Sequence, residues 1–399
     1  MQSISVYIHI PFCPHRCGYC DFNTYAGLEG LISSYCQAIC REINILSSSI
    51  NERLPIRTIY FGGGTPSILP IIEIQKILLT LNDNFNLGDS VEISLEANPG
   101  TVTKEYLVQL RLLGVNRLSF GMQSANPSEL ILLERQHLSI DIKNSVEWAR
   151  IAGFNNLNLD LIFGLPYQEI NAWVNSIEVA ISLHPEHLSL YALTIEKGTP
   201  LYRKVIAGFL PEPDPDLAAD MYDYACNKLA EAGYSQYEIS NWARYNQNGK
   251  LYSCHHNLQY WRNLPYIGIG AGAHGYINEI RTENVAKPGN YINRLNITNI
   301  QNYEDLIFPR TSATKQITII DNETEIGETM MMGLRLVNEG VSNKKIINKF
   351  GITLQQRFGP QINRLIEIGL LEWAGDEMDV LRLTNNGRLL GNQVFKEFI

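Results

Sequence analysis

Three cysteines near the start of the chain have a spacing that could hold an inorganic cofactor. Cys13, Cys17 and Cys20 follow the pattern C-x3-C-x2-C, directly after a short apolar run that reads as the first strand. Thiolates favour soft metal centres, and three of them on one loop can converge on a single site. If the centre is a four-iron cluster, three protein ligands leave one iron free to bind a small molecule. The spacing therefore predicts a metal centre with an open coordination position.

A zinc site is the alternative for the same cysteines. Zinc also takes thiolate and imidazole ligands, and His9 or His15 could be the fourth ligand. Zinc sites more often show two separated C-x2-C pairs, which this loop does not have. The spacing therefore favours the iron–sulfur cluster and leaves zinc open.

A repeated strand–helix rhythm follows the cysteine loop and must position it. Six strand–helix units in succession indicate right-handed crossovers and a parallel sheet. We therefore expect an α/β fold, an open or partial (βα)6 barrel of the TIM type, since a full set of eight units is not visible. After the first strand, the predicted strands cover 57–61, 91–95, 115–120, 157–162 and 187–193, and the predicted helices cover 28–46, 70–81, 103–113, 140–152, 168–183 and 216–232.

Polar residues in this repeat fall just after the predicted strands. In barrels of this kind the carboxyl ends of the strands form the active face, so six loops are expected to converge on one site around the cysteines. Besides the cysteines, these loops carry the glycine-rich segment 62–65, Glu96, Gln123, Asp160 and the segment 191–196.

The individual polar residues have two interpretations each. Glu96 and Asp160 are either solvated loop carboxylates or groups that bind an amino group or a ribose, and Gln123 and Arg135 carry the same ambiguity. The glycines at 62–64 lack the lysine of a phosphate-binding loop, but they would let the backbone approach a ligand closely.

A second glycine-rich segment and the remaining cysteines carry less information. Residues 268–275 superficially resemble a dinucleotide fingerprint, but no βαβ unit follows them. Cys36, Cys40 and Cys226 lie on predicted helices and are expected to be small buried residues. The methionines at 330–332 are expected to fill the core.

The segment at 254–261 is rich in metal-capable and aromatic side chains. His256 is either an ordinary hydrogen-bonded histidine or an axial ligand to haem iron, with Tyr260 and Trp261 as flat apolar neighbours for the porphyrin. Both interpretations stay open from the residues alone.

The chain is expected to divide into three parts. Residues 1–240 form the partial barrel, 241–325 contain the His256 segment and an irregular polar connector from about 276, and 326–399 form a separate module. Three helices, a hairpin over 370–373 and 379–383, and a last helix from Thr384 predict a winged-helix-like α+β module.

Composition excludes several classes of function. The 399 residues carry a net charge of −9, which argues against a nucleic-acid partner and favours a packing or partner surface for the C-terminal module. No leader and no apolar run of membrane-spanning length is present. Seven cysteines clustered toward one end fit a reducing compartment better than a disulfide framework. We therefore expect a cytoplasmic protein.

At the cysteine motif the chain resembles the radical S-adenosylmethionine (SAM) proteins. Over its whole length it is similar to the coproporphyrinogen-III-oxidase-like branch of that superfamily. The shared motifs are Y-x-H-I-P-F-C at 7–13, G-G-G-T-P at 62–66 and D-L-I-F-G-L-P at 160–166. The resemblance implies that Cys13, Cys17 and Cys20 hold a [4Fe–4S] cluster whose open iron binds SAM.

The resemblance also implies contacts for SAM. Tyr7, Gly63 and Glu96 match positions that contact the SAM on the cluster. Positions that hold a second SAM in the oxidase match Tyr19, Gly64, Thr65, Gln123, Arg135, Asp160 and Ala192. Whether a second SAM binds here stays open.

Two departures from the oxidase separate this chain from it. The oxidase has a fourth cysteine at the position of Phe22, and it carries an extension before its first strand where this chain has only a few residues. The segments C-D-F at 20–22 and H-N-x-x-Y-W at 256–261 resemble the haem chaperones of the branch instead. That resemblance implies haem as a further cofactor, His256 as ligand to its iron, and Tyr260 and Trp261 as contacts.

The resulting expectation is a haem chaperone, favoured over a coproporphyrinogen III oxidase, and enzymatic activity stays open. It would bind haem, a [4Fe–4S] cluster and SAM, and would pass haem to haem-accepting proteins of unknown identity. The alternative is an oxygen-independent coproporphyrinogen III oxidase, which forms protoporphyrinogen IX by radical SAM oxidative decarboxylation. The sequence fixes neither the oligomeric state, monomer or dimer, nor peripheral membrane contact.

Overall fold

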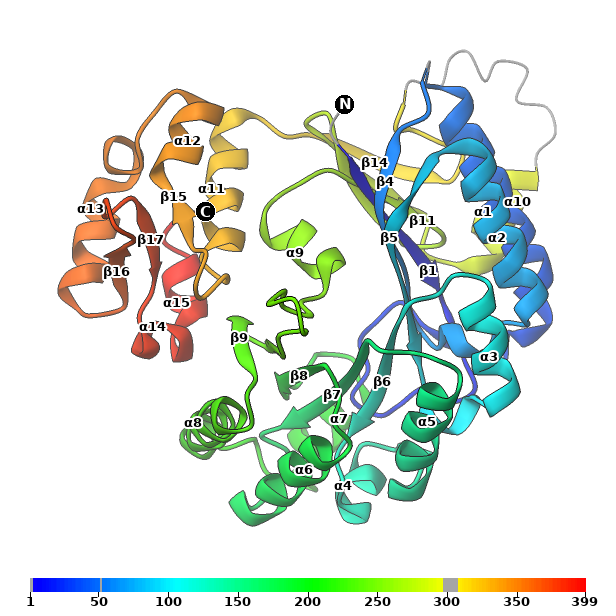
Figure 1. Ribbon diagram of the computed structural model, residues 1–399, viewed down its shortest axis with the longest axis horizontal. Coiled ribbons are helices and arrows are strands. Elements are labelled where there is room, and N and C mark those ends of the chain that lie inside the picture. The colour runs from blue at the N-terminus through cyan, green and yellow to red at the C-terminus, as the bar shows by residue number, and fades with distance from the viewer. Residues whose placement is uncertain (1–2, 51, 297–307) are drawn as a thin grey trace. The chain divides into compact units, whose positions relative to one another are not determined.

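The computed structural model describes residues 3–50, 52–296 and 308–399 (Figure 1). The chain falls into two compact units. The first contains residues 1–232 and 265–318, and the second contains 233–264 and 319–399. The division into 1–240, 241–325 and 326–399 stays a prediction.

The first unit is built on the parallel sheet that the strand–helix rhythm predicted. Six strands lie next to one another in chain order, and each pairs in parallel with the next. The sheet does not close, so the predicted partial (βα)6 barrel is confirmed. The six strands are β1 (Ile4–Ile10), β4 (Pro55–Gly63), β5 (Asn86–Ala97), β6 (Arg117–Gln123), β7 (Leu157–Phe163) and β8 (His187–Ala192).

Helices cover the outer side of this curved sheet (Figure 1). Each buries one apolar stripe, as Tyr35, Ile39, Ile43 and Leu46 do on α1, because residues three or four apart share a helix face. The six predicted helices are confirmed as α1 (Ile32–Ser48), α2 (Ile71–Asn84), α3 (Lys104–Leu112), α5 (Ser139–Ile151), α6 (Ile170–Ser182) and α8 (Pro215–Glu231). Two short helices were not predicted, α4 (Pro127–Leu132) and α7 (Pro200–Ile206).

The ends of the helices follow local chemistry. The Thr103 hydroxyl accepts a hydrogen bond from the Tyr106 N–H and begins α3. Gly114, just after the same helix, has φ +97°, a conformation that glycine adopts without steric cost. These signals explain why the helix bounds could be predicted within a few residues.

The segment from about residue 276 was predicted to be an irregular connector with short helical pieces; a short helix is present, but the strands in this segment were not predicted. Further strands extend the sheet beyond β1, to which β11 pairs in parallel, and a helix follows them. Polar composition misled the prediction because Asn284 and Thr311 are buried and hydrogen-bonded to Glu42. The elements are β11 (Tyr266–Ile269), β12 (His274–Ile277), β13 (Ile280–Asn284), α10 (Pro288–Asn296) and β14 (Thr314–Ile319); residues 297–307 lie outside the described residues.

The second unit contains the predicted winged-helix-like module. Its core is apolar and includes Met330, Leu334, Phe358 and Leu381, so the expectation of a core role is confirmed for Met330. The module consists of α11 (Asn322–Gly333), α12 (Asn343–Phe350), α13 (Leu354–Glu367), a sheet in the order β15 (Val341–Ser342), β17 (Val380–Leu383), β16 (Leu371–Ala374), and the short helices α14 (Asn385–Leu389) and α15 (Gly391–Phe395).

A smaller part of the second unit precedes this module in the chain. β9 (Ser235–Glu238) and β10 (Asn241–Ala243) pair antiparallel. The helix α9 (His255–Trp261) follows and carries the His256 segment. Throughout the described residues, no helix combines the length and the apolar character that crossing a membrane would require.

Candidate functional site

The cysteine loop leaves the carboxyl end of β1. Two short strands, β2 (Phe12–Cys13) and β3 (Tyr25–Ala26), pair with each other and close the loop at its base. Cys13 is buried, Cys17 and Cys20 are half-buried, and all three are free thiols. The fold thus presents three unoxidised thiols on one loop at a strand end, which fits the donor set of an iron–sulfur cluster.

Each of the three thiols has a polar neighbour. The Thr65 hydroxyl donates to Cys13 Sγ at 3.5 Å, and Arg135 Nη1 donates to Cys17 Sγ at 3.6 Å. Cys20 Sγ lies 3.8 Å from the Thr24 hydroxyl. Burial raises the pKa of the Cys13 thiol, and the hydrogen bond from Thr65 partly offsets that effect. Donors from two other loops therefore converge on the cysteine loop, as the strand-end argument predicted.

The histidines do not support the zinc alternative. His9 is buried, and its two ring nitrogens contact the Tyr7 hydroxyl at 3.0 Å and the Asn23 carbonyl oxygen at 2.9 Å. Burial lowers the pKa of His9, which favours the neutral ring. His15 Nε2 lies 3.9 Å from a Glu134 oxygen. Within the described ranges, no three His, Cys, Asp or Glu side chains form a group that could hold a single metal ion. This includes the three cysteines, which in a cluster would each bind a different iron.

Tyr7, Tyr60, Gly63 and Glu96 form one wall of the site on neighbouring strands. The Tyr60 hydroxyl donates to Glu96 Oε1 at 2.9 Å, and the Gly63 N–H donates to Oε2 at 3.1 Å. The rings of Tyr7 and Tyr60 stack with their centroids 6.3 Å apart. Burial, followed by the charge of Asp160, raises the pKa of Glu96 to about 7. This carboxyl group therefore changes charge near neutral pH.

The glycines at the end of β4 are required by close contact with the cysteine loop. A Cβ on Gly64 would lie 2.6 Å from the Phe12 carbonyl oxygen, and one on Gly63, where φ is +113°, would lie 2.5 Å from the His9 ring. The Gly64 and Thr65 N–H groups donate to the carbonyl oxygens of Ile10 and Phe12. The glycines therefore bring the β4 loop against the cysteine loop, which places Thr65 beside Cys13.

Arg135 joins the opposite side of the site to the cysteines. Its Nη2 donates to the Gly121 carbonyl oxygen at 3.1 Å, and its guanidinium also hydrogen-bonds the Tyr19 phenol. Its Nε is buried and has no hydrogen-bond partner among the described residues. Burial disfavours the guanidinium charge, but Tyr19 and Cys17 outweigh this effect and raise the pKa of Arg135.

Gln123 ends β6 and has φ +62°. Its Nε2 lies 2.9 Å from the point that a Cβ would occupy if Gly121 carried a side chain.

Asp160 lies in the middle of β7, and Ala192 lies at the end of β8. The Asp160 carboxylate accepts hydrogen bonds from the Ser119 hydroxyl and the Asn158 amide, both at 2.8 Å. Burial raises the pKa of Asp160, and these hydrogen bonds partly offset that rise. Ala192 ends β8 opposite Phe163 of β7 and is exposed.

A buried hydrogen-bond network supports the cysteine loop from behind, and sequence reasoning missed it. Asn23 Nδ2 donates to the carbonyl oxygens of Ala271 and Ala286, both at 3.0 Å. The Tyr35 hydroxyl donates to the His9 carbonyl oxygen at 2.8 Å and accepts from the Ala271 N–H at 2.7 Å. The segment 268–275 is thus a support for the end of β1, and not a dinucleotide site.

Glu42 anchors that network. Its carboxylate accepts hydrogen bonds from the Gly270 N–H, Asn284 Nδ2, the Tyr291 hydroxyl and the Thr311 hydroxyl, at 2.6 to 3.0 Å. Glu42 is an acidic residue on the otherwise apolar buried stripe of α1. An acidic residue at such a position was the one signal in the sequence that could have indicated a buried hydrogen-bond network. Sequence reasoning also missed Tyr60 as a residue of the site. Tyr60 and Gly62 are two positions apart, so they lie on the same face of β4.

The residues of the His256 segment lie in the second unit. His256 Nε2 is 3.1 Å from the Tyr260 hydroxyl, and the two rings are nearly perpendicular. The guanidinium carbon of Arg335 lies 4.4 Å from the centre of the Trp261 ring. The strand-end residues thus gather in the first unit, and His256, Tyr260 and Trp261 gather on α9.

Comparison with known proteins identifies the class first. Residues 7–180 match the Radical SAM superfamily, and residues 320–390 match the HemN C-terminal domain. The Radical SAM superfamily implies a [4Fe–4S] cluster and SAM, and the cysteine loop described above fits that donor set.

Relatives that match over the full length define the family. The chain is 38% identical to "Heme chaperone HemW" of Bacillus subtilis, covering 99% of both chains. It is 34% identical to "Heme chaperone HemW" of Lactococcus lactis, covering 99% of this chain and 97% of the relative. The chain therefore belongs to the HemW family.

A solved structure confirms the fold. Coproporphyrinogen III oxidase (HemN) from Escherichia coli, a radical SAM enzyme, superposes with a TM-score of 0.82. The match covers 99% of this chain and 90% of the oxidase chain at 22% sequence identity. At that identity the match establishes the shared architecture only.

The raised pKa of Glu96 predicts a pH-dependent stability. The folded state holds the Glu96 proton more tightly than the unfolded chain, so the contribution of this group is greatest below its ordinary pKa of 4.5 and is lost as pH rises to about 7. We expect the free energy of unfolding of the wild type to fall relative to that of Glu96→Gln across this window in urea titrations. Glu105→Gln, an exposed change on α3, is the control and should follow the wild type; parallel curves for wild type and Glu96→Gln would contradict the assignment.

Proposed function

We propose that this chain is a haem chaperone that binds haem together with a [4Fe–4S] cluster and SAM and delivers haem to haem-dependent proteins. The observation that carries the proposal is the 38% identity to "Heme chaperone HemW" of Bacillus subtilis over 99% of both chains. The three free cysteines on the β1 loop and the histidine on α9 supply donors for the two kinds of iron centre.

The cysteine loop is proposed to hold the cluster. Cys13, Cys17 and Cys20 would each ligate one iron and leave one iron available to the amino and carboxylate groups of SAM. When bound, the cluster supplies an electron-transfer centre beside SAM. Thr65 and Arg135 direct donors at Cys13 and Cys17, which stabilises negative charge on the sulfurs.

The strand ends are proposed to orient SAM. Tyr7, Gly63 and Glu96 form the wall next to the cysteine loop and are assigned to the SAM on the cluster. In its ionised form Glu96 accepts a hydrogen bond from a ligand amino group. The residues assigned to a second SAM are Tyr19, Gly64, Thr65, Gln123, Arg135, Asp160 and Ala192.

Haem is proposed to bind at α9. His256 would ligate the haem iron through an imidazole nitrogen, and Tyr260 and Trp261 would contact the porphyrin. Because His256 Nε2 now lies 3.1 Å from the Tyr260 hydroxyl, that contact must break if Nε2 is the ligating nitrogen.

Phe22 argues against the oxidase alternative. It stands where the resemblance places the fourth cysteine of the oxidase, and a phenyl ring can supply neither a metal ligand nor a proton. Its side chain is 64% exposed, so it is not a residue that the core requires. Coproporphyrinogen III oxidation remains the second candidate because the solved oxidase shares the architecture.

The proposal includes a cytoplasmic location and an acceptor protein. Haem would leave for a haem-dependent protein whose identity the chain does not specify, with the donor a monomer or a dimer. The net charge of −9 makes nucleic acid an unsuitable partner.

The cluster assignment is tested by Cys17→Ala. After anaerobic reconstitution we expect the wild type to hold about four iron atoms per chain and the variant to lose most of them, since two remaining thiolates hold a cluster poorly. Iron and sulfide analysis with visible absorption measures the loss. Cys36→Ala, a buried position on α1, is the control and should keep its iron. A Cys17→Ala protein that keeps wild-type iron and absorption would refute the assignment.

The haem assignment is tested by His256→Ala. We expect haem titration followed at the Soret band to show an affinity at least about tenfold weaker, because an iron–imidazole bond is lost. The neighbouring His255→Ala on the same helix is the matched control and should bind like the wild type. Equal spectra and affinities for His256→Ala and the wild type would remove His256 as a ligand.

A further inference from the structure

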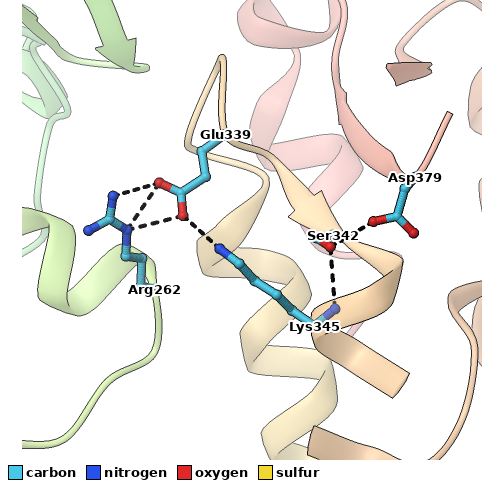
Figure 2. A network of polar contacts seen from close by, with 5 residues as sticks. All are labelled: Arg262, Glu339, Ser342, Lys345 and Asp379. Atoms are coloured by element: carbon cyan, nitrogen blue, oxygen red, sulfur yellow. Dashed lines mark hydrogen bonds and ion pairs between the residues drawn. The ribbon is translucent and has the colours of Figure 1, made fainter. Parts of the chain in front are cut away.

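The carboxyl end of α9 is fastened to the C-terminal module within the second unit. Arg262, the residue after α9, makes a two-pronged ion pair with Glu339: Nη2 donates to Oε2 at 2.7 Å, and Nε donates to the same carboxylate at 3.0 and 3.1 Å (Figure 2). Both side chains are only about one-third exposed, at 31% and 32%. Paired donors of this kind fix orientation as well as distance.

Glu339 belongs to a network that continues through the module. Lys345 Nζ donates to Glu339 Oε1 at 3.2 Å, and the Lys345 N–H is bonded to the Ser342 hydroxyl, which donates to Asp379 Oδ2 at 2.8 Å (Figure 2). Burial opposes ionisation, but the bonds from Arg262 and Lys345 lower the pKa of Glu339. The Glu339 carboxylate is therefore stabilised in its charged form by Arg262 and Lys345 together.

Contacts of three other kinds join the end of α9 to the C-terminal module. The Arg335 guanidinium lies over the Trp261 ring at 4.4 Å, within the range of a cation–π interaction. Asn263 Nδ2 donates to the Thr329 hydroxyl at 3.0 Å. Leu336 packs in one apolar cluster with Leu258 and Trp261. The end of α9 is thus held by charge, aromatic, polar and apolar contacts at once.

The length of α9 makes these contacts necessary. The helix has only seven residues, and helices shorter than about 12 residues are not stable by themselves in water. Its position must therefore come from tertiary contacts. His256 lies on the first turn of the same short helix, so a displacement of Trp261 and Arg262 also displaces His256.

We propose that the C-terminal module is the scaffold that positions α9 for haem binding, and that Arg262, Glu339 and Arg335 are its positioning residues. The haem part of this statement rests on the function proposed above, whereas the scaffold part concerns the chain without haem. The proposal gives the winged-helix-like module a role that requires no nucleic acid.

The scaffold is tested by hydrogen exchange on the full-length chain without haem. Glu339→Gln removes the charge that both Arg262 and Lys345 contact, and we expect the amides of 254–264 to exchange about threefold to tenfold faster. Arg262→Lys keeps the positive charge but loses the second donor of the guanidinium group, so the increase in exchange rate should be smaller than in Glu339→Gln. Glu372→Gln breaks an ion pair with Arg382 inside the same module and is the matched control, with no change expected at 254–264. Unchanged exchange there in Glu339→Gln would overturn the proposal.

The role in haem binding is tested by haem dissociation rates. We expect haem to leave Glu339→Gln about threefold to tenfold faster than the wild type and Glu372→Gln at the wild-type rate. If His256→Ala weakens haem binding but Glu339→Gln dissociates like the wild type, the positioning role is overturned while the haem site stands. If His256→Ala binds haem normally, the proposed haem site fails, and the exchange experiment still decides whether the module is the scaffold of α9.

Discussion

Parallel pairing of successive strands is the constraint on which the first unit depends. Because β1, β4, β5, β6, β7 and β8 run in the same direction, their carboxyl ends lie on one edge of the sheet. Residues that are up to about 150 positions apart in the sequence therefore lie at or near this edge: the cysteine loop, Thr65, Glu96, Arg135 and Asp160. The pairing brings these groups to one edge, and the close contacts of Gly63 and Gly64 with the cysteine loop then place Thr65 beside Cys13.

Bringing polar groups together in the interior costs folding free energy unless the buried groups have hydrogen-bond partners. Burying a carboxylate without partners would cost several kcal/mol, and the four donors around Glu42 offset that cost. Those donors come from segments beyond residue 265, which return to the sheet beside β1. The late part of the first unit thus fixes the backbone under the cysteine loop. The chemistry at residues 13–20 depends on chain that follows it by about 250 residues.

The sequence predicted the elements well where a local pattern determines them. The six parallel strands and their helices follow from periodicity and from stops such as Gly114, and the cysteine spacing indicated the metal centre. The extension by β12, β13 and β14 was missed because polar residues such as Asn284 point inward to Glu42, which reverses the usual relation between polarity and exposure. The Arg262–Glu339 pair spans 77 residues, and no local signal connects its members. Long-range pairs of this kind follow from the fold, so they were not accessible to sequence reasoning.

The central claim is that a radical SAM scaffold serves haem delivery here and not porphyrinogen oxidation. The most direct test is anaerobic incubation of the cluster-reconstituted chain with SAM, a reductant and coproporphyrinogen III, with the E. coli oxidase as the positive control and chromatography of the porphyrins as the readout. The account predicts that coproporphyrinogen III is recovered unchanged while the same preparation binds haem. Formation of protoporphyrinogen IX above the level of a Cys17→Ala preparation would contradict it.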